Sequence, residues 1–426
     1  MKTLILGAGV SGESAARLAC NRGDSVSVYD RSSKATLSLR ERGYAVHSGA
    51  WTDRLLRDIN LVVVSPGFPE HSDPVRHSID SGIEVVSELE FGIRQLSVPY
   101  VAITGTNGKT TATTAIADML NASGVSAVAA GNIGVPICDL GSEPADVVVL
   151  EASSFQLRFV DRFHPVAAGI TNVAADHLDW HGSVAAYAAA KARIFENMRG
   201  DDLLAYDTDD EGARELASAA ACETVAVSGT SVPRGGIGPD AGSLVIGGQR
   251  LTLSTKDPSF VADLGISAAV AAAVGATDTG IEAVLSSFRP GAHRRRTVGR
   301  ADGIQWIDDS KATNPHAARA AAASYERVVL LAGGRNKDLD LSNIAPASVR
   351  HVVAFGESAS DVASGFDGPI TVVGGLDEAV AAAHRIAMSG DTVLLAPGCA
   401  SFDEFESYSV RGERFAELVA EAEASK

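Results

Sequence analysis

The chain of 426 residues is long enough for several domains, and its formal net charge of -17 argues against binding nucleic acid or anionic membranes, which needs clustered positive charge. Hydrophobic residues make up 46% and charged residues 21%, a composition typical of a soluble globular protein. The four cysteines include no CxxC pair, so we expect no zinc site or disulfide framework and a reducing cytoplasm. Because no apolar run reaches the roughly 18 residues of a membrane span, we expect no membrane insertion.

Short apolar runs at 3–7, 25–30 and 60–67 alternate with helix-like stretches, which predicts a parallel sheet wound with helices in a first domain, 1–96. The turn GAGVSG, at 7–12, follows the first run, and Asp30 ends the second. This pattern matches the dinucleotide fingerprint. Its glycines provide a tight turn near a pyrophosphate, so a nicotinamide cofactor and a UDP conjugate are both permitted.

A phosphate loop opens the central domain, 97–291. In GTNGKTT, Gly105 and Gly108 would let backbone N–H groups approach an anion, Lys109 supplies a charge and the Thr110 hydroxyl can hold Mg²⁺. Ile103 stands where the common GxxxxGK[ST] pattern has glycine, so the motif is a shortened relative of it. Its position between an expected strand and an expected helix predicts a nucleotide site.

Other polar residues in the central part are candidates for metal or phosphate contacts. Glu151 closes an apolar run at 145–153, where a carboxylate can reach a phosphate-bound Mg²⁺ or can instead cap a helix. DHLDWH, at 176–181, has Leu178 where the zinc motif HExxH needs Glu, so zinc is not expected. Its histidines belong either to a solvated loop or to the site. The run HRRR, at 293–296, is either a linker or a source of a cation for the phosphates.

The last part of the chain alternates again, from IQWIDDS through RVVLLAGG and TVLLAPG to a helix from about residue 410. It predicts a third α/β domain, 292–426. We also expect the alanine-rich tracts at 217–221, 268–273 and 317–323 to be helices packed against sheets.

Five motifs together resemble the Mur ligase family of amide-forming synthetases, over essentially the whole chain. They are GTNGKTT, GNIGVP at 131–136, EASSFQL at 151–157, DHLDWHGS with YAAAKAR at 176–193, and DDSKATN at 308–314. The resemblance implies an α/β fold with a Rossmann-like UDP-binding domain, a central P-loop ATPase-type domain and a Rossmann-like C-terminal domain.

The same resemblance implies ATP-dependent ligation of D-glutamate to UDP-N-acetylmuramoyl-L-alanine through an acyl phosphate, a cytoplasmic step of peptidoglycan precursor synthesis. DSKATN after HRR favours D-glutamate over the amino acids of sister ligases, which are the nearest alternative. An NAD-dependent oxidoreductase, suggested by the first turn, would leave the phosphate loop, Glu151 and DSKATN without a purpose. We expect a monomer.

By resemblance, Thr110, Glu151, His177 and Lys191 would hold two Mg²⁺ ions. Lys191 would be carbamylated by CO₂ to become a carboxylate-like ligand, although its spacing from Tyr187 also suits a surface lysine. Lys109, Glu151, His177, Lys191 and Arg294 form the implied catalytic set. The implied ATP-binding positions are Gly105, Thr106, Asn107, Gly108, Lys109, Thr110, Thr111, Arg294, Asp309 and Lys311.

The resemblance also assigns the two other substrates. The UDP substrate is expected at Gly9, Val10, Ser11, Gly12, Asp30, Arg31, Ser65, Gly67 and Asn132. Arg31 departs from the smaller hydroxyl residue common in the family. D-glutamate is expected at Thr313, Lys337, Ser401 and Tyr408, since a cation and hydroxyl donors suit its carboxylates, with Arg335 as a second clamp.

Adenine recognition departs from the family pattern. The family usually opens a central-domain helix with an Asn pair that meets adenine, whereas SFVADLGISAAV contains no Asn. Asp263 and Ser267 are the polar candidates there, and no adenine contact is assigned.

Overall fold

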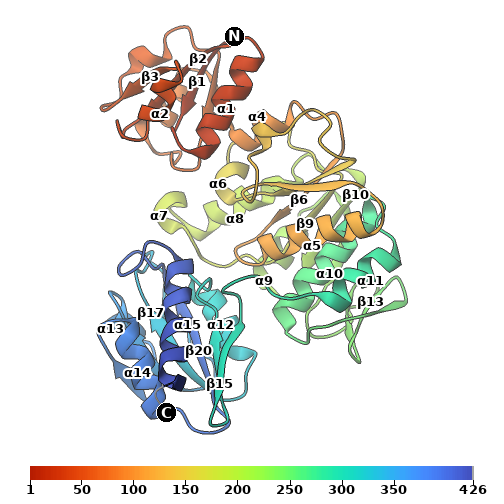
Figure 1. Cartoon of the computed structure of the whole chain (residues 1–426). Coiled ribbons are helices and arrows are strands. Elements are labelled where there is room, and N and C mark those ends of the chain that lie inside the picture. The colour runs from red at the N-terminus through yellow and green to blue at the C-terminus, as the bar shows by residue number, and fades with distance from the viewer. Residues whose placement is uncertain (425–426) are drawn as a thin grey trace. The chain divides into compact units, whose positions relative to one another are not determined.

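Residues 1–424 are described in the computed structural model, where they form three wound α/β sheets and one small antiparallel sheet (Figure 1). The described residues divide into two compact units, residues 1–173 with 180–288, and residues 174–179 with 289–424. The predicted three-domain α/β class is confirmed. Among the described residues, no helix is both long and apolar enough to cross a membrane.

The first sheet has the strand order β3-β2-β1-β4-β5, with every pairing parallel. Because the order reverses between β1 and β4, the carboxyl ends of these two strands flank the point where such sheets bind ligands. The strands are β1 (Lys2–Leu6), β2 (Ser25–Asp30), β3 (Ala45–Ser48), β4 (Leu61–Val64) and β5 (Glu84–Ser87). The helices are α1 (Val10–Asn21), α2 (Leu37–Glu41), η1 (Asp53–Leu56), α3 (Asp73–Asp80) and α4 (Glu88–Ile93).

The central sheet is also parallel, in the order β11-β10-β9-β6-β8-β7. Its strands are β6 (Tyr100–Thr104), β7 (Ala127–Gly131), β8 (Val147–Glu151), β9 (Ala167–Ile170), β10 (Gly200–Asp207) and β11 (Cys222–Val227). The helices are α5 (Lys109–Ala122), η2 (Ile137–Asp139), α6 (Ser154–Leu157), α7 (Leu178–His181), α8 (Val184–Ala192), η3 (Arg193–Phe195), α9 (Glu211–Ala217), α10 (Pro258–Ala273) and α11 (Asp278–Ser287). Figure 1 shows α5, α10 and α11 side by side on this sheet, and they pack on one another. β12 (Gly238–Asp240), β13 (Ser243–Ile246) and β14 (Gln249–Thr252) form the antiparallel sheet.

The third sheet, in the second unit, has the order β15-β16-β20-β17-β18-β19. Only its edge pair β15–β16 is antiparallel. Its strands are β15 (Arg296–Ala301), β16 (Ile304–Asp308), β17 (Val328–Gly333), β18 (Val349–Phe355), β19 (Ile370–Val372) and β20 (Thr392–Gly398). The helices are α12 (Pro315–Ala323), α13 (Ala359–Ser364), α14 (Leu376–Ile386) and α15 (Tyr408–Ala424).

The alanine-rich tracts show where sequence prediction was right and where it was wrong. Residues 268–273 lie in α10 and 317–323 in α12, as expected. The tract at 217–221 is mostly not helical, because α9 ends at Ala217 and β11 begins at Cys222. Backbone bonds from Ala219 to Leu216 and from Ala220 to Ala217 form a turn there. A short alanine tract therefore did not override the start of the next strand.

Candidate active site

The phosphate loop joins the end of β6 to the start of α5, and two of its positions accept only glycine. Gly105 has φ +152°, and a Cβ there would lie 1.8 Å from Thr171 Oγ1. Gly108 has φ +83°, and a Cβ there would lie 2.2 Å from Asp263 Oδ1. The two glycines therefore allow the loop backbone to pack closely against Thr171 and Asp263. The amino end of α5 follows the loop directly.

Asn172, which sequence reasoning missed, supports this loop. Its carbonyl oxygen accepts from Thr106 N at 2.8 Å, and its Oδ1 accepts from Asn107 N at 2.9 Å. The signal for it is topological, because Asn172 follows β9 and β9 pairs with β6. The carboxyl ends of two paired parallel strands meet at one edge of the sheet.

Two lysines converge on one carbonyl oxygen of the phosphate loop. Lys109 Nζ donates to Gly105 O at 2.9 Å, and Lys191 Nζ donates to the same oxygen at 2.6 Å. Lys191 comes from α8, is 1% exposed and lies over the Tyr187 ring at 4.4 Å. The Tyr187 hydroxyl lies 3.1 Å from Thr106 Oγ1. Lys191 is thus not a surface lysine.

Glu151 ends β8 with its side chain 2% exposed. Its Oε1 accepts from Asn132 Nδ2 at 2.8 Å, while Oε2 is buried with no hydrogen-bond partner among the described residues. The helix-cap alternative is wrong, because Ser153 caps α6 and Gln156 completes that capping box. A buried carboxylate oxygen with an open coordination position fits an oxygen-liganded cation such as Mg²⁺.

The remaining predicted metal ligands do not form a ready-made cluster. Thr110 and Thr111 lie in the first turn of α5 and are half-buried. His177 belongs to the segment 174–179 of the second unit and has φ +52°, an unusual conformation for a residue other than glycine. Within residues 1–424, no three His, Cys, Asp or Glu side chains gather as a metal site.

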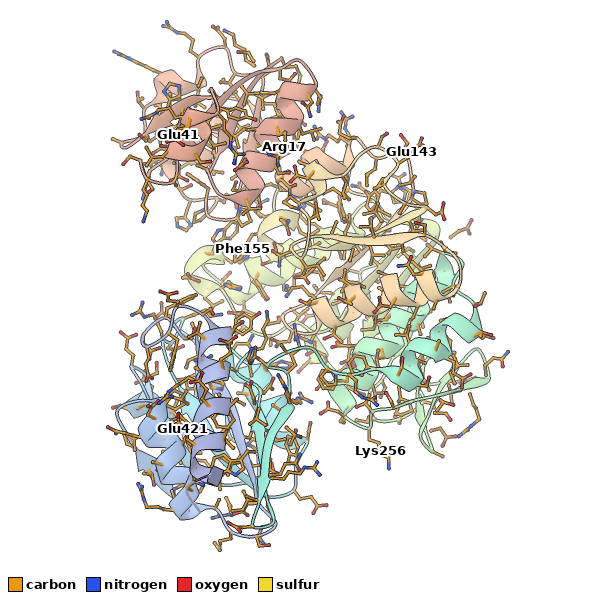
Figure 2. The ribbon with its side chains drawn as sticks, in the orientation of Figure 1. Arg17, Glu41, Glu143, Phe155, Lys256 and Glu421 are labelled. Atoms are coloured by element: carbon orange, nitrogen blue, oxygen red, sulfur yellow. The ribbon has the colours of Figure 1, made fainter. Side chains whose placement is uncertain are left out.

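Trp180 and His181 pack within the first unit, so His181 is not on a solvated loop. The His181 ring stacks on Phe155, labelled in Figure 2, with ring centroids 5.6 Å apart, and its Nε2 lies 3.0 Å from Ser154 Oγ. Trp180 Nε1 donates to Pro66 O at 3.0 Å. Pro66 lines a pocket at the edge of the first sheet, so Trp180 supports a wall of this pocket.

A pocket of about 680 Å³ lies at the carboxyl edge of the first sheet. Seven of the nine residues expected at the UDP substrate line it: Gly9, Val10, Ser11, Asp30, Arg31, Ser65 and Gly67. Gly12 instead shapes the turn, because a Cβ there would lie 1.9 Å from Gly7 O. Asn132 does not line this pocket and donates to Glu151 instead. Phe68 and His71 also line the pocket and were not predicted, although they follow β4 at the same edge.

Asp30 holds the rim of this pocket with both carboxylate oxygens. Oδ2 accepts from Ala8 N at 3.0 Å, and Oδ1 accepts from Ser32 N at 2.8 Å. These bonds order the glycine turn and the segment after β2 together. Each carboxylate oxygen keeps a further lone pair for a ligand.

In the second unit, Arg294 lies between two residues with left-handed backbones, His293 at φ +56° and Arg295 at φ +50°. His293 Nδ1 lies 2.6 Å from Asp308 Oδ2, and Arg295 N donates to Asp309 Oδ1 at 3.3 Å. Burial raises the pKa of Asp309 to about 6, opposed by the charges of Arg295 and Arg294. The HRRR segment is therefore anchored to the strand end at 308–309 and is not a free linker.

Lys311, expected at ATP, and Tyr408, expected at D-glutamate, are in direct contact. Lys311 Nζ donates to the Tyr408 hydroxyl at 2.9 Å and lies 4.0 Å from the ring centroid. The hydrogen bond from Lys311 lowers the pKa of the Tyr408 hydroxyl. The structure thus joins two positions that the sequence assigned to different substrates.

The other positions expected at D-glutamate differ in their surroundings. Lys337 forms an ion pair with Asp176 at 2.9 Å, and Ser401 is buried. Thr313 is half-buried, whereas Arg335 is exposed and paired with Glu357 at 2.8 Å. The alternative that Ser401 starts a helix is wrong, because α15 begins at Tyr408.

Arg411 was also missed. This residue of α15 is 1% exposed, and burial lowers its pKa to about 10. It donates to Ser310 Oγ at 3.0 Å, to Ser310 O at 3.0 Å and to Cys399 O at 3.1 Å. It therefore ties the DSKATN segment to the end of β20.

Three family profiles match successive parts of the chain. The "Mur ligase MurD-like, N-terminal domain" matches residues 1–87, the "Mur ligase middle domain" matches 103–235, and the "Mur ligase, glutamate ligase domain" matches 293–399. Two similar curated relatives are each named UDP-N-acetylmuramoylalanine--D-glutamate ligase. The one from Frankia casuarinae is 41% identical over 98% of this chain and 94% of its own length. The one from Thermobifida fusca is 36% identical over 98% of both.

Solved structures share the fold at low sequence identity. A UDP-N-acetylmuramate-alanine ligase from Thermotoga maritima aligns over 100% of both chains with a TM-score of 0.57 and 19% identity. A pseudomurein peptide ligase type C from Methanothermus fervidus aligns over 99% of this chain and 100% of its own, with a TM-score of 0.64 and 17% identity.

Proposed function

The chain belongs to the Mur ligase family, and from this premise we propose how its residues carry out the reaction of the D-glutamate-adding members. The protein is an ATP-dependent ligase that joins D-glutamate to UDP-N-acetylmuramoyl-L-alanine in peptidoglycan synthesis. The observation that carries the mechanism is the convergence of Lys109 and Lys191 on the glycine-built phosphate loop, beside a buried Glu151.

Activation of the acceptor brings an anionic carboxylate against an anionic triphosphate, so the site must neutralise charge and align the reacting groups. Backbone N–H groups of residues 108–111, at the amino end of α5, would bind the phosphates, with Lys109 as the cation. Lys109 now donates to Gly105 O and Thr106 O, and it would exchange these carbonyls for phosphate oxygens. This step releases ADP and forms an acyl phosphate. The amine of D-glutamate then attacks the acyl carbon and displaces inorganic phosphate to form the amide.

We assign Thr110 and Glu151 to one Mg²⁺, and His177 with carbamylated Lys191 to a second. When bound, Mg²⁺ neutralises phosphate charge and aligns the transferred group. The open position on Glu151 Oε2 supports this assignment. As an ammonium, Lys191 can only donate hydrogen bonds, so CO₂ addition is what would make it a ligand.

The carbamate can be tested without turnover. In ¹³C-bicarbonate, we expect a carbamate carbon resonance from the wild-type protein and none from Lys191→Gln. Lys256→Gln, which changes an exposed lysine, should keep the signal. A wild-type spectrum without a carbamate resonance, with Mg²⁺ and ATP present, would refute the modification.

The first-sheet pocket would take the UDP group, with Gly9, Val10, Ser11 and Gly67 close to the diphosphate and Asp30 and Arg31 at the nucleoside. Ser65 and Asn132 complete the proposed set. Gly9 supports this assignment, because no protein atom lies within 4 Å of a Cβ built there, and the space is therefore open to a ligand.

In the second unit we assign Arg294, Asp309 and Lys311 to ATP, and Thr313, Lys337, Ser401 and Tyr408 to D-glutamate. The contact between Lys311 and Tyr408 supports one shared site for the two steps of the reaction, phosphoryl transfer from ATP and attack by D-glutamate. Cytoplasmic location, a monomeric state and the domain limits 1–96, 97–291 and 292–426 complete the proposal.

The test of the function is phosphate release from ATP with Mg²⁺ and UDP-N-acetylmuramoyl-L-alanine. We expect release and the product mass with D-glutamate, and neither with L-glutamate, L-alanine, L-lysine or diaminopimelate. Release with one of the other amino acids would move the chain to a sister specificity. No release with any of them would overturn the proposal.

A further inference from the structure

Lys337, proposed for D-glutamate, is already occupied by a carboxylate of the protein. Asp176 Oδ1 accepts from Lys337 Nζ at 2.9 Å and from His177 N at 2.9 Å. Asp176 is 4% exposed, and both charged residues belong to the second unit. The His177 ring also faces this carboxylate, with Nε2 3.7 Å from Asp176 Oδ2, but it is charged only when protonated. A substrate carboxylate that took Lys337 alone would therefore leave the buried Asp176 carboxylate without its permanent cation, which is strongly unfavourable.

Asn314 fixes the orientation of Asp176. Its Nδ2 donates to Asp176 Oδ2 at 3.1 Å, while its Oδ1 caps α12 by accepting from Ala317 N at 2.9 Å. Because the cap uses the amide oxygen, the amide nitrogen must face Asp176. The Asp176 side chain is 6% exposed and that of Lys337 is 21% exposed. Lys337 is therefore the half of the ion pair that an incoming molecule reaches first.

We propose that Asp176 and Lys337 together recognise the amino-acid substrate by exchanging ion pairs, with Asp176 taking the ammonium group of D-glutamate and Lys337 taking a carboxylate. This inference rests on the proposed function. The two charged groups of an α-amino acid share one carbon atom, so a single molecule supplies a partner to each half of the Asp176–Lys337 pair. A dicarboxylate without an amino group supplies only one partner and leaves Asp176 uncompensated. Asp176 is thus a specificity-determining residue for amino acids over simple dicarboxylates.

The test compares D-glutamate with glutarate, which lacks only the amino group. We would measure KM for D-glutamate and the competitive inhibition constant of glutarate by phosphate release, in the wild type and in Asp176→Asn. The wild type should prefer D-glutamate by at least about tenfold, and the variant should bind glutarate about tenfold more tightly than the wild type. The preference should then fall to within about threefold. A gain in glutarate binding cannot come from a damaged fold.

Asp338→Asn is the matched control, because it removes the same charge from an exposed residue next to Lys337 and should keep the wild-type preference. If Asp176→Asn turns over too slowly, saturation-transfer NMR of both ligands on the full chain, with ADP and the UDP substrate, gives the same ratio. An unchanged ratio in Asp176→Asn, or an equal change in Asp338→Asn, would overturn this inference alone. Failure of the wild type to release phosphate with D-glutamate would overturn the proposed function itself.

Discussion

The Tyr408 hydroxyl is the group through which the proposed ATP and amino-acid residues of the second unit touch. Tyr408→Phe removes the 2.9 Å hydrogen bond to Lys311 and keeps the ring over which Lys311 lies. Loss of one charged hydrogen bond is worth roughly 1–3 kcal/mol. We expect the free energy of unfolding to fall by up to this amount and KM for ATP to rise by about fivefold or more.

Initial rates at saturating D-glutamate, with ATP varied, measure this effect. Tyr44→Phe is the control. It removes the same hydroxyl group from a residue directly before β3 and should leave KM for ATP unchanged. A Tyr408→Phe enzyme with wild-type KM for ATP would show that Lys311 is positioned by other groups.

Gly105 shows what a missing Cβ does at the phosphate loop. Gly105→Ala would place Cβ 1.8 Å from Thr171 Oγ1 at a φ of +152°, so the loop must move. We expect loss of ATP-dependent protection in thermal unfolding and a destabilisation of about 2–3 kcal/mol. Gly124→Ala is the matched control, because its φ is +82° and nothing lies within 4 Å of the added Cβ. Gly124→Ala should keep the protection by ATP. Loss of protection in both variants would show that the contact of the added Cβ with Thr171 is not the cause.

Single residues were predictable where the spacing of residues within a short motif indicates their function. The glycines and Lys109 of the phosphate loop follow from local spacing, and the structure gives each a geometric reason. Asn172, Asp176 and Arg411 were not predictable in their roles, because each acts on a segment far away in the sequence. Their partners depend on which strand ends the fold brings together.

At the scale of elements, Arg411 links α15 to two loops through one buried guanidinium. Arg411→Lys keeps the charge but cannot reach Ser310 Oγ, Ser310 O and Cys399 O together. We expect the free energy of unfolding to fall by about 2–4 kcal/mol and KM for D-glutamate to rise, because the segment that carries Thr313 and Asn314 loosens.

Urea unfolding and D-glutamate titration measure these two effects. Arg414→Lys, on the same helix but at an ion pair with Asp377 whose two side chains are 32% and 55% exposed, should change neither. Equal effects of the two substitutions would mean that α15 itself is sensitive and that the buried bonds of Arg411 are not the reason.

The parallel strands were predictable as apolar runs between helices, and β1, β4, β8 and β20 all begin and end close to the expected residues. Sheet order was not, because periodicity says which residues are buried and not which strands pair. The 217–221 tract failed for a related reason, since helix propensity is weak beside the pairing of β11 with β10.

At the scale of the whole molecule, the first two sheets share hydrophobic cores, whereas the third sheet has its own. Cys138 packs with Phe91 and the residues of β1 and α1, and Phe159 packs with β1 and β4. The two clusters of the third sheet contain only residues of 298–419. This distribution explains why the first two of the three α/β domains form one compact unit and the third domain forms another.

Glu88 lies where those shared cores meet, and it makes the stability of the first unit depend on pH. Its Oε1 accepts from Cys138 N at 2.9 Å, and Oε2 is buried with no partner among the described residues. Burial raises its pKa to about 7. The folded state therefore binds more protons than the unfolded state between about pH 4.5 and 7, and the stabilisation present at low pH is lost as the pH rises through this range.

Glu88→Gln stays neutral at every pH and removes this dependence. We expect wild-type stability relative to Glu88→Gln to fall by about 2–3 kcal/mol between pH 5 and pH 8. Urea unfolding followed by intrinsic fluorescence measures it, since Trp51 and Trp180 both lie in the first unit. Asp207, whose pKa is also raised to about 7 by burial, contributes equally to both proteins and cancels in the difference. Glu143→Gln, at an exposed position, is the control and should have the stability of the wild type at each pH. If the free energy of unfolding of the wild type and of Glu88→Gln varied with pH in parallel, Glu88 would be ionised in the folded protein.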